Sequence, residues 1–213
     1  IDFGLTGIVV PEENGGMGMS LIELALCAEE LGRSSAAVPF LGHTLATIAI
    51  VEGGSDAQKA KYLPGLASGE VLASVALTED NDTWAPEDWQ MTSEGGTISG
   101  HKRNVPHGEF AQLLVVGLAG GALGVVEVAG GGVSVDKLEP LDLTRPICSI
   151  DFDHAKVDLL ENGPAAAVRT WDAALAHWRT LISDAGARFD REIEIDAGTL
   201  APMISWGTSP EHA

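Results

Sequence analysis

Hydrophobic and polar residues follow a different spacing in three successive parts of the chain. Residues 1 to about 72 carry apolar positions at helical spacing, and residues 73 to about 160 carry short Val- and Ile-rich runs. Beyond about residue 169 an apolar helical stripe precedes a strictly alternating segment at residues 190–196. The pattern predicts an α+β chain: a helical N-terminal segment, an antiparallel β-sandwich or barrel-like middle domain, and a short helix–strand C-terminal appendage.

Two capping boxes mark helix starts in the first part. Ser20 is followed three residues later by Glu23, and Ser55 is followed in the same way by Gln58. In this arrangement the serine accepts an N–H of the first turn, while the third residue bonds back to the cap. The sequence therefore predicts helices that begin directly after Ser20 and Ser55.

The helix ends are marked by glycine and proline. We expect the first helix to end at Gly32 and the other capped helix to end near Pro64. Residues 39–51 are apolar enough to form a buried helix between them. His43 lies in that helix, where a core or surface histidine is a better interpretation than a catalytic one.

The middle part predicts strands joined by glycine turns. Its longest apolar stretch, residues 113–135, contains Glu127 and seven glycines, whereas a membrane helix needs about 20 uninterrupted apolar residues. Short strands at close spacing are typical of a sandwich or barrel. The strand candidates are residues 72–77, 97–100, 113–116, 124–128, 133–135 and 150–152.

Charge and cysteine content restrict the function classes. The 213 residues hold 12 Lys+Arg against 31 Asp+Glu, a net charge of −19, which opposes binding to nucleic acid or to an anionic membrane. Cys27 and Cys148 have no metal-site spacing, and both are expected to be small buried apolar residues of a cytoplasmic protein. No metal site is expected. The first residue is Ile rather than Met, so the chain is expected to be a fragment or a processed product.

One acidic segment stands apart. Residues 79–94 contain six acids and no Lys or Arg, with Trp84 and Trp89 between them. A solvated loop is the ordinary interpretation of such a run, and a rebuilt ligand-binding loop is the alternative.

Six short phrases follow one another along residues 1–165: GIVVPEENGGMG (7–18), AEELG (28–32), QKAKYLPGLASGE (58–70), ALTE (76–79), ISGHKR (98–103) and LDLTRP (141–146). Each phrase is weak evidence alone, and their order is more specific. In this order they resemble the acyl-CoA dehydrogenase family over roughly residues 1–165.

This resemblance implies a helical domain at residues 1–72 and a β-domain at residues 73–165, followed in the family by a four-helix domain. It implies α,β-dehydrogenation of an acyl-CoA thioester with FAD as hydride acceptor, in a homo- or hetero-oligomer. Leu77 and Thr78 then match the family's flavin contacts. Asn104 stands at the position of a stacking aromatic residue, and Pro106 at that of a hydroxyl residue.

The chain also departs from the family pattern. After residues 78–79 the usual Gly- and Ser-containing continuation is replaced by acids, and four acids (79, 80, 82 and 87) would repel the phosphates of FAD or CoA. Pro106 has no side-chain donor. The family's catalytic glutamate lies in the four-helix domain, so no catalytic residue is assigned here. We therefore expect a truncated dehydrogenase, inactive alone, or a non-catalytic partner subunit of a heteromeric one.

Residues 166–213 form a third predicted segment with a different resemblance. Residues 171–197 and 201–210, including WGTSP at 206–210, resemble the large subunit of 3-isopropylmalate dehydratase, an aconitase relative. That family is a hydro-lyase of leucine biosynthesis whose three cysteines hold a [4Fe–4S] cluster. Neither cysteine of this chain lies at residues 169–213, so no cluster ligand is expected. A natural fusion, a misjoined gene and an engineered join all remain open.

Overall fold

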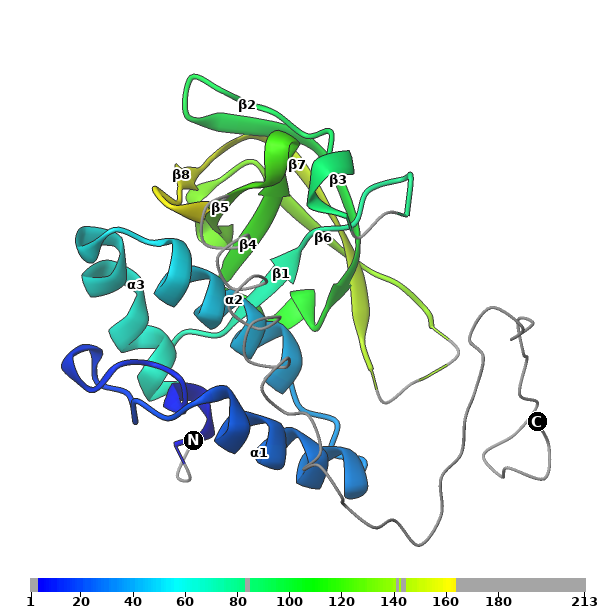
Figure 1. Ribbon diagram of the computed structural model, residues 1–213. Coiled ribbons are helices and arrows are strands. Elements are labelled where there is room, and N and C mark those ends of the chain that lie inside the picture. The colour runs from blue at the N-terminus through cyan, green and yellow to red at the C-terminus, as the bar shows by residue number, and fades with distance from the viewer. Residues whose placement is uncertain (1–3, 83–84, 141, 143–144, 164–213) are drawn as a thin grey trace, which may run out of the picture. The chain divides into compact units, whose positions relative to one another are not determined.

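The computed structural model describes residues 4–82, 85–140, 142 and 145–163 (Figure 1). The helix expected after Thr170 and the strand expected at residues 190–196 lie outside these residues. The described α-helices and strands are α1 Leu21–Arg33, α2 Phe40–Gly53, α3 Asp56–Ser68, β1 Ala73–Ala76, β2 Ser93–Glu94, β3 Thr97–Pro106, β4 Leu113–Leu118, β5 Ala122–Glu127, β6 Val133–Lys137, β7 Ile147–Lys156 and β8 Asp158–Leu159. Short 3₁₀ turns join them, among them η1 Leu5–Gly7 and η4 Gly108–Phe110.

Both expected capping boxes are formed. The Ser20 hydroxyl accepts the N–H of Ile22 at 3.2 Å, and the Glu23 carboxylate accepts the backbone N–H of Ser20 at 2.9 Å. In α3 the same exchange joins Ser55 and Gln58, at 3.0 and 3.4 Å. These local patterns therefore place the starts of α1 and α3 correctly.

The expected end of α3 near Pro64 is wrong. The helix continues through Pro64 to Ser68 and stops before Gly69, which has a left-handed φ of 74°. A proline inside a helix removes one backbone hydrogen bond. Leu63 and Leu66, on either side of it, are fully buried, so their packing offsets that loss.

The strands form two four-stranded sheets. The first has the order β1-β4-β5-β8 and the second β2-β3-β7-β6. All pairs are antiparallel except β1 with β4, where Ala73 lies opposite Leu113 in parallel register. The expected antiparallel sandwich is therefore corrected to one mixed and one antiparallel sheet. The parallel pair arises because the chain builds β2 and β3 of the second sheet before it returns beside β1.

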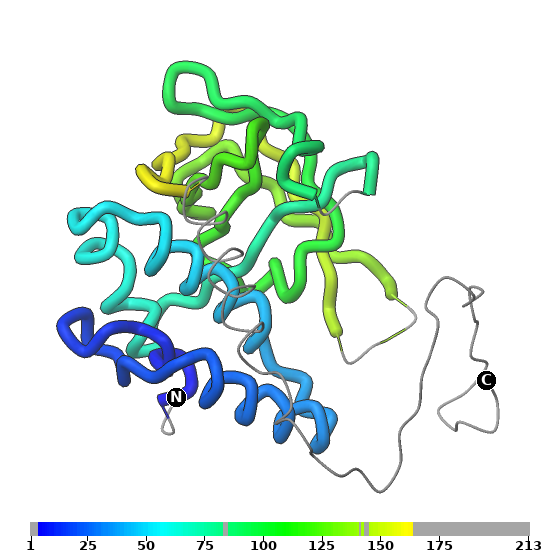
Figure 2. The backbone as a smooth tube through the Cα atoms, viewed as in Figure 1, coloured from blue at the N-terminus to red at the C-terminus, as the bar shows by residue number. Residues whose placement is uncertain are grey.

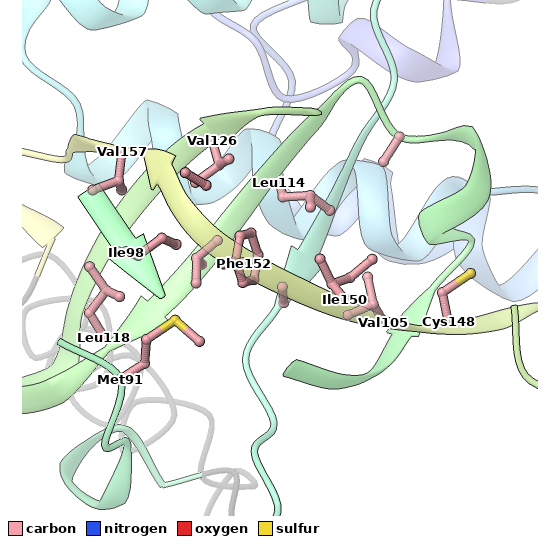
Figure 3. Packing of buried hydrophobic residues seen from close by; sticks show 14 residues of the cluster. Met91, Ile98, Val105, Leu114, Leu118, Val126, Cys148, Ile150, Phe152 and Val157 are labelled. Atoms are coloured by element: carbon pink, nitrogen blue, oxygen red, sulfur yellow. The ribbon is translucent and has the colours of Figure 1, made fainter. Parts of the chain in front are cut away.

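The first sheet lies between the helices and the second sheet. All six residues of β4 are buried, and successive side chains point to opposite faces of a sheet. Leu113 and Val115 pack with α2 and α3, whereas Leu114 and Val116 pack against the second sheet (Figure 3). Figures 1 and 2 show α2 and α3 beside this sheet.

Helix α1 is much less covered than α2 and α3. None of its residues is buried, and Ile22 and Leu26 are 67% and 58% exposed. Cys27 is only half-buried, so its expected burial is wrong, whereas Cys148 is fully buried in β7.

His43 is a buried core histidine, as expected. Its Nδ1 atom accepts the N–H of Ala73 at 3.3 Å, which leaves the proton on Nε2, 3.2 Å from the carbonyl oxygen of Thr6. Burial lowers the pKa of His43, although the contact with Thr6 opposes the shift. The ring thus joins η1, α2 and β1 as a neutral imidazole.

Two negative findings concern the described residues alone. No helix there is both long and apolar enough to cross a bilayer. Within the same residues, no group of three His, Cys, Asp or Glu side chains is arranged to hold a metal ion.

Candidate functional site

The segment leaving β1 meets β3 at the residues that the sequence singled out. Thr78 and Arg103 form an isolated antiparallel bridge, in which the N–H of Arg103 donates to the Thr78 carbonyl at 2.8 Å. This bridge brings Leu77 and Thr78 beside the stretch that contains Asn104. Two segments that are distant in the sequence therefore share one edge of the β-domain.

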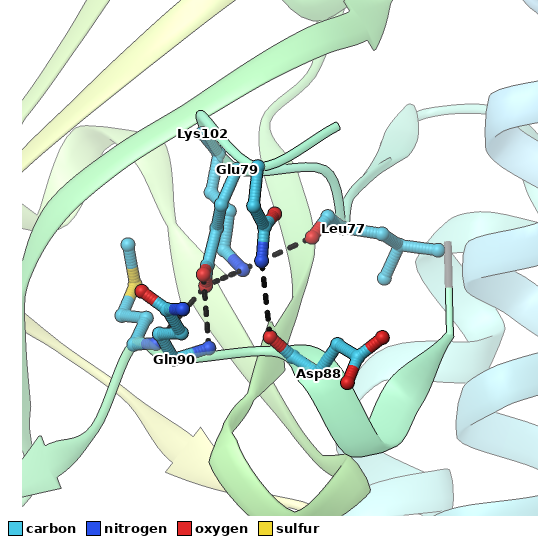
Figure 4. A network of polar contacts seen from close by, with 7 residues as sticks. Leu77, Glu79, Asp88, Gln90 and Lys102 are labelled. Carbon is cyan, nitrogen blue, oxygen red and sulfur yellow. Dashed lines mark hydrogen bonds and ion pairs between the residues drawn. The ribbon is translucent and has the colours of Figure 1, made fainter. Parts of the chain in front are cut away.

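A buried ion pair lies directly next to this bridge. The side chain of Lys102 is 0% exposed, and its Nζ atom is 2.7 Å from Oε1 of Glu79 (Figure 4). Nζ also donates to the carbonyl oxygen of Leu77 at 3.1 Å. Burial lowers the pKa of Lys102, and the Glu79 carboxylate opposes that shift. The ammonium is thus held by acceptors on both sides of Thr78.

Glu79 also closes the base of the acidic loop. Its carboxylate accepts the backbone N–H of Gln90 at 2.9 Å and that of Met91 at 3.0 Å. Burial alone would raise the pKa of Glu79, but the hydrogen bonds from Lys102 and from these two N–H groups bring it below its ordinary value. Glu79 is therefore a buried structural carboxylate and not part of a solvated loop.

Trp89 packs behind the ion pair. Its side chain is 6% exposed, and its ring centroid is 5.8 Å from Nζ of Lys102, within cation–π range. The ring lies against Gly117 of β4, where an added Cβ would approach it to 2.7 Å. Gly117 is therefore a packing glycine inside a strand, not the turn residue that the sequence indicated.

The acidic loop carries less free charge than its composition suggests. Glu79 is paired with Lys102, and a carboxylate oxygen of Asp80 lies 3.6 Å from the Arg103 guanidinium. Two of the four acids expected to repel phosphates therefore face cations, and that expectation is corrected for these two.

Asn104 occupies a backbone conformation that suits its residue type. It is exposed, has a φ of 55°, and lies where the β3–β7 register shifts between Lys102 and Val105. The left-handed region is favoured by Asn and Gly and is strained for a bulky side chain. Asn104 therefore suits the backbone conformation at this position.

Pro106 lies toward the helices. Its carbonyl oxygen accepts the Ser74 hydroxyl at 2.5 Å, and its ring would lie 3.3 Å from a Cβ added at Gly42 of α2. The structure therefore brings Leu77, Thr78 and Asn104 together at one edge and places Pro106 against α2.

The sequence alone assigned no role at the site to Lys102, Arg103 or Trp89. A usable signal existed for Lys102, because Ile98 and Lys102 are an even number of positions apart on one strand and so share a face. Ile98 is buried, which indicates that the lysine also points inward.

A flavin ring carries hydrogen-bond acceptor oxygens and nitrogens along one edge. Residues that hold this edge should therefore offer hydrogen-bond donors. Asn104 contributes an exposed amide, Arg103 a guanidinium on a 42% exposed side chain, and Thr78 a hydroxyl on a residue that is only 4% exposed. These three residues fit an acceptor-rich ring edge. Pro106 offers no side-chain donor.

Two family models match separate parts of the chain. Residues 1–70 match the acyl-CoA dehydrogenase N-terminal domain, and residues 146–213 match the aconitase family (aconitate hydratase).

Individual proteins of both families are similar to this chain. A 3-isopropylmalate dehydratase large subunit 1 of Bradyrhizobium diazoefficiens is 33% identical over 195 residues, which cover 82% of this chain and 39% of that protein. A probable acyl-CoA dehydrogenase of Bacillus subtilis is 39% identical over 123 residues, covering 54% and 21%. A solved variant of the steroid ACAD Tcur3481-Tcur3483 has a TM-score of 0.69 at 32% identity, covering 81% and 48%.

The chain spans less than half the length of each of these proteins. The dehydratase match covers 82% of this chain, far more than residues 169–213, so it extends into the part that matches the dehydrogenases. By sequence and by fold, the described part of the chain resembles acyl-CoA dehydrogenases, with residues 1–70 matching their N-terminal domain, and residues 146–213 match the aconitase family.

Proposed function

We propose that this chain is part of an acyl-CoA dehydrogenase-like flavoprotein and holds the polar ring edge of FAD on Leu77, Thr78 and Asn104. The observation that carries the proposal is the bridge between Thr78 and Arg103, which joins the two segments beside a fixed ion pair. When bound, FAD supplies the hydride acceptor for α,β-dehydrogenation of an acyl-CoA thioester.

The residues of this edge have distinct tasks in the proposal. The Thr78 hydroxyl and the Asn104 amide would hold the ring by hydrogen bonds, and the half-buried Leu77 would help to exclude water from it. The Arg103 guanidinium offsets negative charge at the same edge. Pro106 was expected at this site from the sequence, and it contributes at most an apolar contact because its carbonyl is used by Ser74.

No residue of the described chain is assigned as the base that removes the α-proton. We propose that the 213 residues alone do not turn over an acyl-CoA and act only within a homo- or hetero-oligomer. A non-catalytic partner subunit is the second candidate. One observation favours it: Pro106 lacks a side-chain donor.

A hydro-lyase activity is the third candidate, favoured by the aconitase match at residues 146–213. A [4Fe–4S] cluster needs several thiolates. Cys148 falls within the matched range, but it is fully buried in β7, and burial raises the pKa of its thiol. One buried thiol does not form such a site.

Cofactor reconstitution tests the first proposal. The purified chain is incubated with FAD and freed of excess, and the bound flavin is measured by its absorbance band. We expect Thr78→Ala to weaken binding and Thr97→Ala, at a half-buried threonine whose hydroxyl donates to the Glu94 carbonyl, to leave it unchanged. Absence of bound flavin would refute the flavin site and favour the partner subunit.

Two further assays separate the remaining candidates. An acyl-CoA offered with an artificial electron acceptor should give no reduction, and turnover would refute the proposed inactivity. Iron and sulfide should be absent from the purified protein. Their presence in stoichiometric amounts would favour the hydro-lyase.

A further inference from the structure

Lys102 is the largest fully buried side chain among the described residues, and none of the roles above uses it. Lysine is seldom fully buried without a partner, because removing an ammonium from water is costly. Here the cost is met by the carboxylate of Glu79, the carbonyl of Leu77 and the ring of Trp89. Three separate partners for one buried ammonium indicate that Lys102 does more than fill space in the core.

The contacts of Lys102 fix the backbone around Thr78. Its two oxygen acceptors belong to the residues immediately before and after Thr78, so the ammonium draws both toward the interior. The residue that follows Lys102 is Arg103, whose N–H holds the Thr78 carbonyl. Residues 77–79 are thereby held at every position by two consecutive residues of β3.

The same contacts determine where the acidic loop ends. Glu79, once held by Lys102, binds the N–H groups of Gln90 and Met91. Asn81 donates across the loop to the carbonyl of Asp88 at 3.2 Å, which closes it a second time (Figure 4). One buried ammonium therefore sets both the start and the end of residues 80–88.

We propose that Lys102 is a positioning residue: it fixes residues 77–79 and the base of the 80–88 loop, and thereby sets flavin affinity without touching the cofactor. The claim that Lys102 sets flavin affinity rests on the proposed function. The claim that it fixes residues 77–79 and the base of the 80–88 loop does not. The competing explanation is that Lys102 merely stabilises the β-domain as a whole.

Lys102→Met in the full 213-residue chain tests the proposal. Removing the ammonium leaves Glu79 as an unpaired, largely buried carboxylate, so the local amides should open far more often. We expect hydrogen exchange at Gln90, Met91 and Arg103 to rise by about tenfold or more, with smaller changes at other amides. The FAD dissociation constant should rise by about tenfold or more. The visible circular dichroism of flavin at saturation should change.

Two matched controls separate positioning from general stability. Lys137→Met removes an exposed lysine paired with Glu109 and should leave exchange at Gln90 and Met91 and the flavin signal unchanged. Ile50→Val removes one methyl group from the helical core cluster, against which Leu77 also packs, and lowers stability without removing any polar contact of Lys102. It too should leave the flavin circular dichroism unchanged, because a purely structural loss does not alter the ring's surroundings.

The outcomes are separable. The proposal is overturned if Lys102→Met keeps the wild-type hydrogen-exchange rates at Gln90 and Met91. It is also overturned if these rates rise while the FAD affinity and the flavin spectrum stay unchanged. If the wild-type chain binds no FAD, the proposed function fails, and the exchange data alone decide whether Lys102 fixes the loop. If Lys102→Met does not fold, Glu79→Gln, which keeps an acceptor oxygen but loses the charge, should show the same changes at smaller size.

Discussion

Gly117 in β4 makes room for the indole ring of Trp89, and an alanine there should displace that ring. A Cβ at Gly117 would lie 2.7 Å from the Cε3 and Cζ3 atoms and 2.9 Å from Cδ2 of Trp89. Non-bonded carbons pack best at about 3.5–4.0 Å, so the ring must move by roughly 1 Å. Overpacking of this kind costs about 1–3 kcal/mol. We expect Gly117→Ala to lower the melting temperature by roughly 4–8 °C for a loss near 2 kcal/mol.

Urea and thermal unfolding followed by far-UV circular dichroism measure this loss. Gly32→Ala is the matched control, because Gly32 lies in α1 with no atom within 4 Å of an added Cβ. A Gly-to-Ala change at such a helix position should stabilise by up to about 1 kcal/mol. Trp89→Leu combined with Gly117→Ala should cost less than the sum of the two single changes. A wild-type unfolding midpoint for Gly117→Ala would refute the reasoning.

Two further predictions concern His43 and Asn104. Burial lowers the pKa of His43 below 6.5, so the unfolded chain takes up this proton more readily than the folded chain. Stability should therefore be complete above about pH 6.5 and fall as the pH drops through that value, with a slope approaching about 1.4 kcal/mol per pH unit. His43→Gln should reduce that slope in urea titrations, and an unchanged slope would contradict the assignment. Asn104→Phe should cost about 1–2 kcal/mol because of the left-handed φ of 55°, and Asn104→Gly should not. Equal unfolding midpoints for these two variants would show that the left-handed φ at residue 104 does not cause the loss of stability.

The features predicted correctly from sequence are local ones. A capping box joins residues three apart, so Ser20 and Ser55 reveal their helices without knowledge of the fold. The end of α3 was missed because Pro64 is tolerated through burial of Leu63 and Leu66 against other elements. The parallel pairing of β1 was missed for the same reason, since register across a sheet depends on the path of the chain between the strands.

The candidate site divides in the same way. Leu77 and Thr78 could be singled out from a short motif, but the pairing of Glu79 with Lys102 joins residues 23 positions apart. A count of acidic residues treats every carboxylate as solvated. The loop was therefore expected to repel phosphate groups more strongly than its paired carboxylates do. The placement of Trp89 depends on a glycine in another strand, which no local pattern records.

The parallel pair of β1 and β4 has a consequence for synthesis of the protein. β1 gains its partner only when residues 113–116 are available, after β2 and β3 have been made. The buried faces of α2 and α3 also need β4 and β5, because Leu113, Val115 and Val125 complete their core cluster. Contacts between distant residues delay folding, since the intervening chain must first be ordered. A nascent chain therefore leaves the buried faces of α2 and α3 uncovered until β5 has emerged from the ribosome, and during this interval they are open to proteases and chaperones.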